Sequence, residues 1–343
     1  MSAPLLVVDP GCPAPYDTAA LARGGIGGTE ATVLKVLTRL AAERPVTLAQ
    51  AGRAAPLRNG LLGLAPLAEA LDVARSEPVI VVINSWKVAL RLRKLNPSAR
   101  ILIWLHVLPG KHNRDIGPRL KAARIEVVCV SASHEEMLRR ALLSHQPGLP
   151  RLCHVHNPVE DDLRPDATPR DRDQLLFASA PHKGLGQVYE RFARMRARIP
   201  TLKLWVADPG YMRWEVPEPP EGVEVLGALP REEVLLRMRR SLCLFYPQTH
   251  FAETFGLVLA EANATGTPVI AHHGLGANEE VVSSAEQVFD TTDDNALAAR
   301  LADWRAAPPA VTMRPAFRMS AVLEAWRKTL APVRAAPLAM AAE

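Results

Sequence analysis

The stretch YPQTHFAETFGLVLAEANATGTPVIA, residues 246–271, holds the end of one strand, a helix and the next strand in succession. The first strand is the apolar run from Leu242 to Tyr246, and a turn of small residues before Val269 leads into the second. Short, continuously apolar strands separated by helices are typical of a parallel sheet that is buried on both faces. This unit therefore predicts an α/β fold, with a helix at about 256–265 between the two strands.

The same alternation runs through most of the chain. Strands are expected at 5–8, 46–49, 79–83, 101–105, 127–130 and 153–155, and then at 175–178, 202–207 and 223–226. Helices are expected at about 29–42, 66–75, 85–95, 115–124, 132–144, 186–199, 231–239 and 319–330. Two such series predict two Rossmann-like domains facing across a cleft, with ligands at the carboxyl ends of the strands.

A polar, proline-containing stretch, NPVEDDLRPDATPRDRD at 157–173, separates the two series. We therefore assign residues 1–160 to an N-terminal domain, 161–173 to a linker and 174–312 to a C-terminal domain. Residues 313–332 are expected to form a last helix that packs back on the N-terminal domain. The tail, 333–343, is expected to be disordered.

Composition excludes several classes of protein. The chain has 343 residues, 48% of them hydrophobic and 22% charged, which excludes a single small module and wholesale disorder. Its apolar runs are too short for a transmembrane helix, and the opening LLVV run has no basic region before it, so no signal peptide is expected. Its four cysteines lie far apart, without the short spacings of a metal site. A reduced, cytoplasmic protein without a metal ion is predicted.

Positive charge is concentrated in one part of the chain. The net charge is +5, but residues 85–124 contain ten basic residues against one acid, Asp115, a local charge of +9 that leaves −4 for the rest. Such a surface suits anionic lipid headgroups, a phosphate-bearing substrate or nucleic acid. The alternative is a solvated helix face in an arginine-rich protein.

Two carboxylates flank the start of the helix in the opening stretch. Glu253 and Glu261 lie eight residues apart, and the segment Thr254, Phe255 and Gly256 is expected to place backbone amides at the helix N-terminus. Unpaired amides and the helix dipole bind anions, so a diphosphate fits there. Glu253 can accept hydrogen bonds from sugar hydroxyls, and Glu261, about two turns on, from a ribose. Two solvated carboxylates are the alternative.

These residues resemble the E-x7-E motif of the retaining GT-B glycosyltransferases of family 4, and the resemblance extends through GTPVIA at 266–271. It implies transfer of a sugar from a nucleotide-diphosphate sugar to an acceptor hydroxyl, with the anomeric configuration retained. It also implies that the donor binds mainly to the C-terminal domain and the acceptor to the N-terminal one. Neither a metal ion nor another cofactor is expected.

Further segments resemble the family more weakly. SAPHKGL at 179–185 resembles the loop whose lysine, here Lys183, neutralises the donor diphosphate. Many members carry an arginine just upstream, where this chain has Ser179, Ala180 and Pro181, and His182 is a weak substitute. In VEVLGAL at 223–229, the resemblance assigns base contacts to Leu226 and Gly227.

In the N-terminal half, GGIGGTE at 24–30 resembles the glycine-rich loop that approaches the acceptor, which makes Gly27 and Gly28 candidate site residues. His106 in IWLHVLPG falls on the active-site histidine that contacts the donor sugar, although a histidine at a strand end is often structural. Ser131 and Asn157 match landmarks of the cleft.

The resemblance thus implies a glycosyltransferase of bacterial cell-surface glycan or glycolipid synthesis. From the basic window at 85–124, the acceptor is expected to be lipid-linked or phosphorylated and to be met at the cytoplasmic face of an anionic membrane, and no nucleic acid partner is expected. The sugar, the base (UDP, GDP or ADP) and the acceptor itself stay open. A binding protein for nucleotide sugars or sugar phosphates that keeps the fold without turnover is the main alternative. A nicotinamide-dependent oxidoreductase is disfavoured because the G-x-G-x-x-G spacing is absent.

Overall fold

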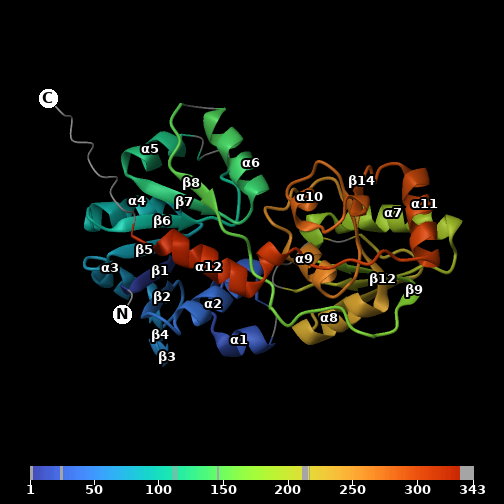
Figure 1. The fold of residues 1–343 in the computed structure, drawn as a ribbon, viewed down its shortest axis with the longest axis horizontal. Helices are drawn as coiled ribbons and strands as arrows, with labels where there is room; N and C mark the ends of the chain where they lie inside the picture. Colours follow the sequence, from blue (N-terminus) through green and yellow to red (C-terminus); the bar gives the residue numbers. More distant parts are fainter. Residues whose placement is uncertain are drawn as a thin grey trace, which may run out of the picture.

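The computed structural model describes residues 3–23, 26–110, 113, 115–144, 147–210, 215 and 217–332. These residues form two sheets that stand side by side, each covered by helices (Figure 1). Both sheets are parallel apart from one hairpin, so the expected α/β architecture with two Rossmann-like domains is confirmed. The expected disordered tail lies outside the described residues.

The N-terminal sheet has eight strands in the order β3-β4-β2-β1-β5-β6-β7-β8. The strands are β1 (Leu5–Asp9), β2 (Val46–Gln50), β3 (Leu57–Asn59), β4 (Leu62–Pro66), β5 (Val79–Ile83), β6 (Arg100–Trp104), β7 (Ile125–Cys129) and β8 (Leu152–His154). The helices are α1 (Thr18–Arg23), α2 (Gly28–Leu40), α3 (Ala70–Val73), α4 (Trp86–Leu95), α5 (Ile116–Ala122) and α6 (Ala132–Leu143). Every residue of β1 is buried because this strand lies between β2 and β5.

The C-terminal sheet has six strands in the order β11-β10-β9-β12-β13-β14. The strands are β9 (Asp171–Ala178), β10 (Lys203–Ala207), β11 (Val223–Gly227), β12 (Ser241–Tyr246), β13 (Val269–His272) and β14 (Val288–Phe289). The helices are α7 (Leu185–Arg198), α8 (Arg231–Arg240), α9 (Leu257–Ala264), α10 (Asn278–Val281) and α11 (Asp294–Ala306). The strand order reverses between β9 and β12, and such a switch point opens a crevice at the carboxyl ends of the strands.

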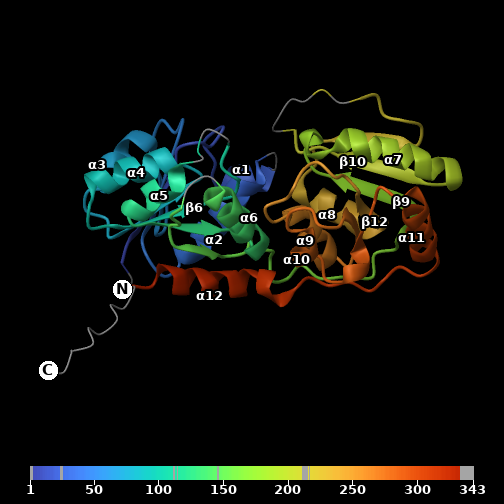
Figure 2. The same cartoon turned by 90° about the horizontal axis from the view of Figure 1, so that it is seen from above.

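The last helix, α12 (Met319–Leu330), returns to the N-terminal domain and lies along it (Figure 2). Its Trp326 packs edge-on against Trp104 of β6, with ring centroids 4.5 Å apart. Arg100 of β6 donates hydrogen bonds to the carbonyls of Thr329 and Ala331 at 2.7 and 2.8 Å. Helix α12 is therefore part of the N-terminal core.

Several boundaries differ from the expected ones. β9 begins at Asp171, inside the expected linker. The strand can start with charged residues because they lie at its exposed end, where Lys203 pairs with Asp171 and Arg305 pairs with Asp173. Of the helix expected at 66–75, only the short α3 is an α-helix. The end of β4 and a 3-10 turn precede it. Within the described ranges, no helix combines the length and apolar character needed to cross a membrane.

Candidate active site

A cavity of about 220 Å³ lies between the two domains at the carboxyl ends of the C-terminal strands. Its wall includes Gly28 from α2 of the N-terminal domain and, from the C-terminal domain, Lys183, Asp208, Glu253 and Glu261. The four residues of the C-terminal domain follow β9, β10 and β12 or lie on α9, so the cavity opens at the switch point between β9 and β12. The structure thus gathers residues from distant parts of the sequence where the fold predicts a ligand.

A larger cavity, of about 800 Å³, lies at the opposite, amino ends of the N-terminal strands. It is lined by residues such as Pro78, Arg100 and Arg327. We place the site in the smaller cavity because it holds the convergent charged residues at the carboxyl ends of the strands, where open α/β sheets bind ligands.

Glu253 is the most closely held carboxylate of the site. Its side chain is buried and lies 2.9 and 3.0 Å from Nζ of Lys183, and it accepts a hydrogen bond of 2.8 Å from the Tyr246 hydroxyl. Burial, together with the neighbouring Glu253, raises the pKa of Tyr246 well above its usual value, so the phenol stays a donor. A buried carboxylate requires such compensation, which Lys183 and Tyr246 supply together.

The loop after β9 fixes the position of Lys183. Residues Pro181–Lys183 form a 3-10 turn that ends at Gly184, which has a φ of +92°. A Cβ at Gly184 would collide with the side chain of Gln248, so this position requires glycine in both conformation and space. The Lys183 ammonium also lies 4.8 Å from the centre of the Phe251 ring, and the His182 ring packs against the same phenylalanine. The Lys183 ammonium is therefore held by the Glu253 carboxylate and by the Phe251 ring.

The helix N-terminus begins later than expected. α9 starts at Leu257 after Gly256, which has a φ of +86°, so the amides of its first turn belong to Leu257 and Val258, and both residues line the cavity. Thr254 instead faces the N-terminal domain, where its Oγ1 donates to the carbonyl of His106 at 2.8 Å. The Phe255 ring is buried against Phe317. The side chains of Thr254 and Phe255 therefore do not line the cavity but hold the loop that precedes α9 in place.

Glu261 is paired with Arg231, the first residue of α8, by an ion pair. The Glu261 carboxylate raises the pKa of Arg231, against the effect of burial. A second cation comes from α2, where burial and the nearby Arg231 lower the pKa of Lys35, and its Nζ lies 3.9 Å from Glu160. Sequence reasoning missed Arg231, although its place at the start of the helix that follows β11 was a signal.

His106 follows β6 and is 7% exposed. Its amide donates to Asn84 at 2.7 Å, and its ring packs against Trp104. Burial, with a contribution from His134, lowers the pKa of His106 to about 3, so the imidazole is neutral at physiological pH. Among the residues that the structure describes, its Nε2 has no hydrogen-bond partner. His106 contacts the site through Thr254 rather than through the cavity wall.

The remaining candidates lie at different distances from the cavity. Gly28 lines it, whereas Gly27 precedes α2 and is covered by the carboxylate of Glu30, and the first two glycines of that loop lie outside the described residues. Leu226 and Gly227 are not part of the cavity wall, and the carbonyl of Gly227 accepts from the amide of Asp208 at 3.1 Å. Their contact with a base stays a prediction.

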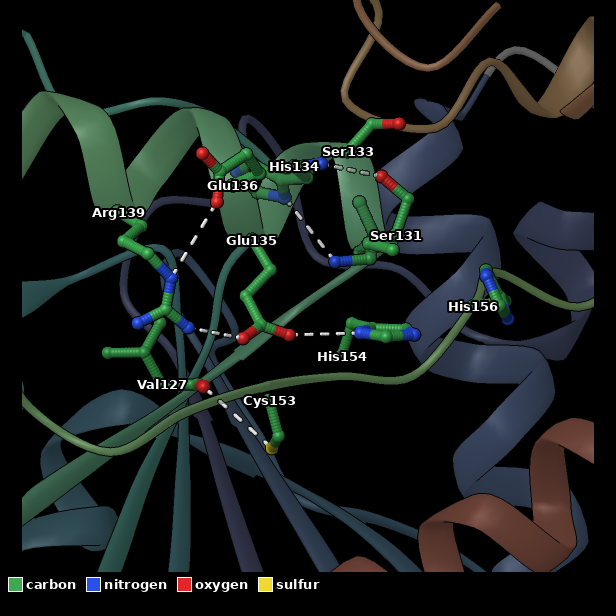
Figure 3. A network of polar contacts seen from close by, with 12 residues as sticks. Val127, Ser131, Ser133, His134, Glu135, Glu136, Arg139, Cys153, His154 and His156 are labelled. Carbon is green, nitrogen blue, oxygen red and sulfur yellow. Dashed lines mark hydrogen bonds and ion pairs between the residues drawn. The ribbon is translucent and has the colours of Figure 1, made fainter. Parts of the chain in front are cut away.

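Both cleft landmarks, Ser131 and Asn157, are buried. Ser131 caps α6 by accepting a hydrogen bond from the amide of His134 at 2.8 Å (Figure 3). Asn157 is buried near the start of the linker. In the described parts of the chain, no three histidine, cysteine, aspartate or glutamate side chains gather in a way that could hold a metal ion.

Part of the chain matches a known sequence family. Residues 162–314 match the sequence family described as glycosyl transferases group 1. A phosphatidyl-myo-inositol mannosyltransferase of Propionibacterium freudenreichii subsp. shermanii is 38% identical over 91 residues, which are 26% of this chain and 22% of that protein. The matched segment is thus about a fifth of that relative's length.

Solved structures resemble nearly the whole chain. A glycosyltransferase involved in avilamycin A biosynthesis, AviGT4, is 18% identical, with a TM-score of 0.60, over 95% of this chain and 96% of its own. The Anabaena protein Alr3699/HepE, solved in complex with UDP and glucose, is 13% identical, with a TM-score of 0.61, over 96% and 99% of the two chains. These similarities show that the chain has the two-domain fold of GT-B glycosyltransferases.

Proposed function

We propose that this chain transfers a sugar from a nucleoside-diphosphate sugar to an acceptor hydroxyl, with retention of the anomeric configuration. The observation that carries the proposal is the buried Glu253 carboxylate, held by Lys183 and Tyr246 beside Glu261 at the switch point of the C-terminal sheet. The family match over residues 162–314 supports it, because that stretch contains all four residues.

The arrangement suits departure of a nucleoside diphosphate. Negative charge grows on the leaving diphosphate in the transition state, and Lys183 with the first-turn amides of α9 would stabilise it more than the bound donor. Glu253 would hold sugar hydroxyls and Glu261 the ribose. A contact of the neutral His106 with the donor sugar stays a prediction, because His106 does not line the cavity. None of these roles requires a metal ion or other cofactor, so we propose a metal-independent reaction.

A second candidate is a binding protein for nucleotide sugars or sugar phosphates without turnover. One observation favours it: where family members carry an arginine, this chain has Ser179, Ala180 and Pro181, and the first two line the cavity without charge. Lys183 would then face the diphosphate without a second cation from that loop.

Turnover assays with UDP-, GDP- and ADP-sugars, with and without EDTA, separate the two candidates. We expect release of nucleoside diphosphate with at least one donor class, survival of activity in EDTA, and an NMR spectrum of the product that shows the donor's anomeric configuration. Binding of a nucleotide sugar without release of diphosphate would favour the second candidate. Inactivation by EDTA that a divalent ion reverses would contradict metal independence.

The acceptor is proposed to be lipid-linked or phosphorylated, met at the cytoplasmic face of a membrane during cell-surface glycan or glycolipid synthesis. Not all of the basic window is available for it. Arg93 donates to five backbone carbonyls, including that of Ala123, and Arg100 pairs with Glu126, while Lys111 and Arg114 lie outside the described residues. The exposed cations that remain are Lys87, Arg91, Lys94, Arg119, Lys121 and Arg124. They support attraction to an anionic surface.

A further inference from the structure

One contact between the two domains caps the N-terminus of α6 with a residue of the other domain. The amides of Ala132 and Ser133 donate to the two carboxylate oxygens of Glu280, on α10, at 2.9 and 2.7 Å. The next amide, that of His134, is already taken by Ser131 (Figure 3). The first-turn amides of a helix have no intrahelical acceptor, so Glu280 satisfies two of them from across the domain boundary.

Glu280 is charged in this contact. Burial would raise its pKa, but hydrogen bonds from the His156 side chain and from Ser133 and Ala132 outweigh burial and hold the pKa at about 2. The His156 ring lies 2.8 Å from Glu280 through Nε2 and is packed edge-on against Phe317, with ring centroids 4.8 Å apart. A carboxylate at the positive end of a helix is favoured further by the helix dipole.

The same contact is linked to Glu253. The amide of Ala277, the residue before α10, donates to the carbonyl of Glu253 at 2.9 Å. Gly276, with a φ of +60°, lies so close to the backbone of Glu253 that a Cβ there would not fit. A displacement of α10 would therefore displace Glu253 as well.

The N-terminal domain contacts the segment that follows Glu253 from the other side. The hydroxyl of Ser131, at the start of α6, donates to the carbonyl of Thr254 at 2.5 Å, and Thr254 in turn donates to the carbonyl of His106. The residues directly after Glu253 thus lie between α10 on one side and α6 with His106 on the other.

We propose that Glu280 is a positioning residue that locks the two domains in the arrangement in which Glu253 faces the acceptor-binding domain. Glu280 does not line the cavity, so it acts through α6 and through the segment that carries Glu253. The inference rests on the proposed function for its effect on catalysis. Its effect on the domain arrangement does not depend on that function.

The test compares Glu280→Ala, Glu280→Gln and a control, Glu190→Gln, which removes the charge of an exposed carboxylate on α7 of the same domain. Small-angle scattering of Glu280→Ala should give a larger radius of gyration than the wild type, because the domains separate. Its kcat should fall about 10- to 100-fold, as small misplacements of reacting groups do. Calorimetric affinity for nucleoside diphosphates should stay at the wild-type value.

Glu280→Gln should recover part of the lost kcat, because its amide oxygen still accepts from α6. An unchanged radius of gyration and an unchanged kcat in Glu280→Ala would overturn the proposal. The proposal would also be overturned if Glu280→Ala and Glu280→Gln lost thermal stability, nucleotide affinity and kcat together and to the same extent. That result is expected if Glu280 only stabilises the fold by capping α6. If the wild type turns over no nucleotide sugar, the proposed function fails, while scattering still decides whether Glu280 holds the domains.

Discussion

Arg231 balances the charge of Glu261 in the proposed ribose site, and the two come from different helices. Glu261→Ala should weaken the binding of nucleoside diphosphates by about 1.5–3 kcal/mol, the contribution of hydrogen bonds to a charged group. Arg231→Gln should cause a smaller loss, because the carboxylate stays but is no longer held in place. Arg240→Gln, at the exposed end of the same helix, is the control and should bind normally. Wild-type affinity of Glu261→Ala in calorimetry would rule out the ribose contact.

Two buried histidines make the fold sensitive to acid. Burial lowers the pKa of His106 to about 3 and that of His134 to about 4, so both stay neutral in the folded chain while unfolded histidines take up protons below pH 6.5. The free energy of unfolding should therefore fall as the pH drops below 6.5, by about 1.4 kcal/mol per pH unit for each histidine. When the free energy of unfolding is measured with urea between pH 7 and 5, it should fall less steeply with decreasing pH in His134→Gln than in the wild type. Equal slopes would contradict the neutral state of His134.

At the residue scale, the sequence identified Lys183 and Glu253, which lie 70 positions apart and meet in the structure. Their neighbours carry local signals, a glycine after the lysine and a helix start after the glutamate. Arg231 has only a weak signal, its place at the start of the helix after β11, because its importance comes from an ion pair that forms only when α8 packs against α9. The neutral state of His106 likewise depends on burial by the surrounding chain.

Among the elements, α4 has an apolar face and a basic face. Trp86, Ala89 and Leu92 are buried, whereas Lys87, Arg91 and Lys94 are exposed, at the i, i+4 and i+7 spacing of one helix face. Reversing these three charges should abolish sedimentation with anionic liposomes at low salt, because each cation near such a surface contributes about 1 kcal/mol. Arg240→Glu, in the other domain, is the control. Binding that is equal for neutral and anionic vesicles, or unaffected by the reversal, would favour a soluble acceptor.

Strands such as β1 and β5 were predictable because they are continuous apolar runs. The hairpin of β3 and β4 was not, since β3 is fully exposed and its three residues carry no apolar alternation. α11 was missed although Leu297, Leu301 and Trp304 form a buried face at helical spacing. β14 has two residues, too few for any periodic signal.

For the whole molecule, contacts across the domain boundary decide how the two halves of the site face each other. The sequence predicts two domains because the alternation of strands and helices starts twice. It does not predict that Glu280 caps α6, because that pair is separated by 148 and 147 positions and depends on the docking of complete domains. The packing of Trp326 on Trp104 joins residues that lie still further apart in the sequence, by 222 positions.

The central claim, that Glu253 with Lys183 forms the reaction centre of a glycosyltransferase, is tested most directly by the turnover of a nucleotide sugar by Glu253→Gln. This variant keeps the size of the side chain and removes its charge, so the protein should fold and bind nucleoside diphosphate as the wild type does. Its kcat should fall about 30- to 1,000-fold, corresponding to about 2–4 kcal/mol of lost transition-state stabilisation. A folded Glu253→Gln variant with the wild-type kcat would contradict the account.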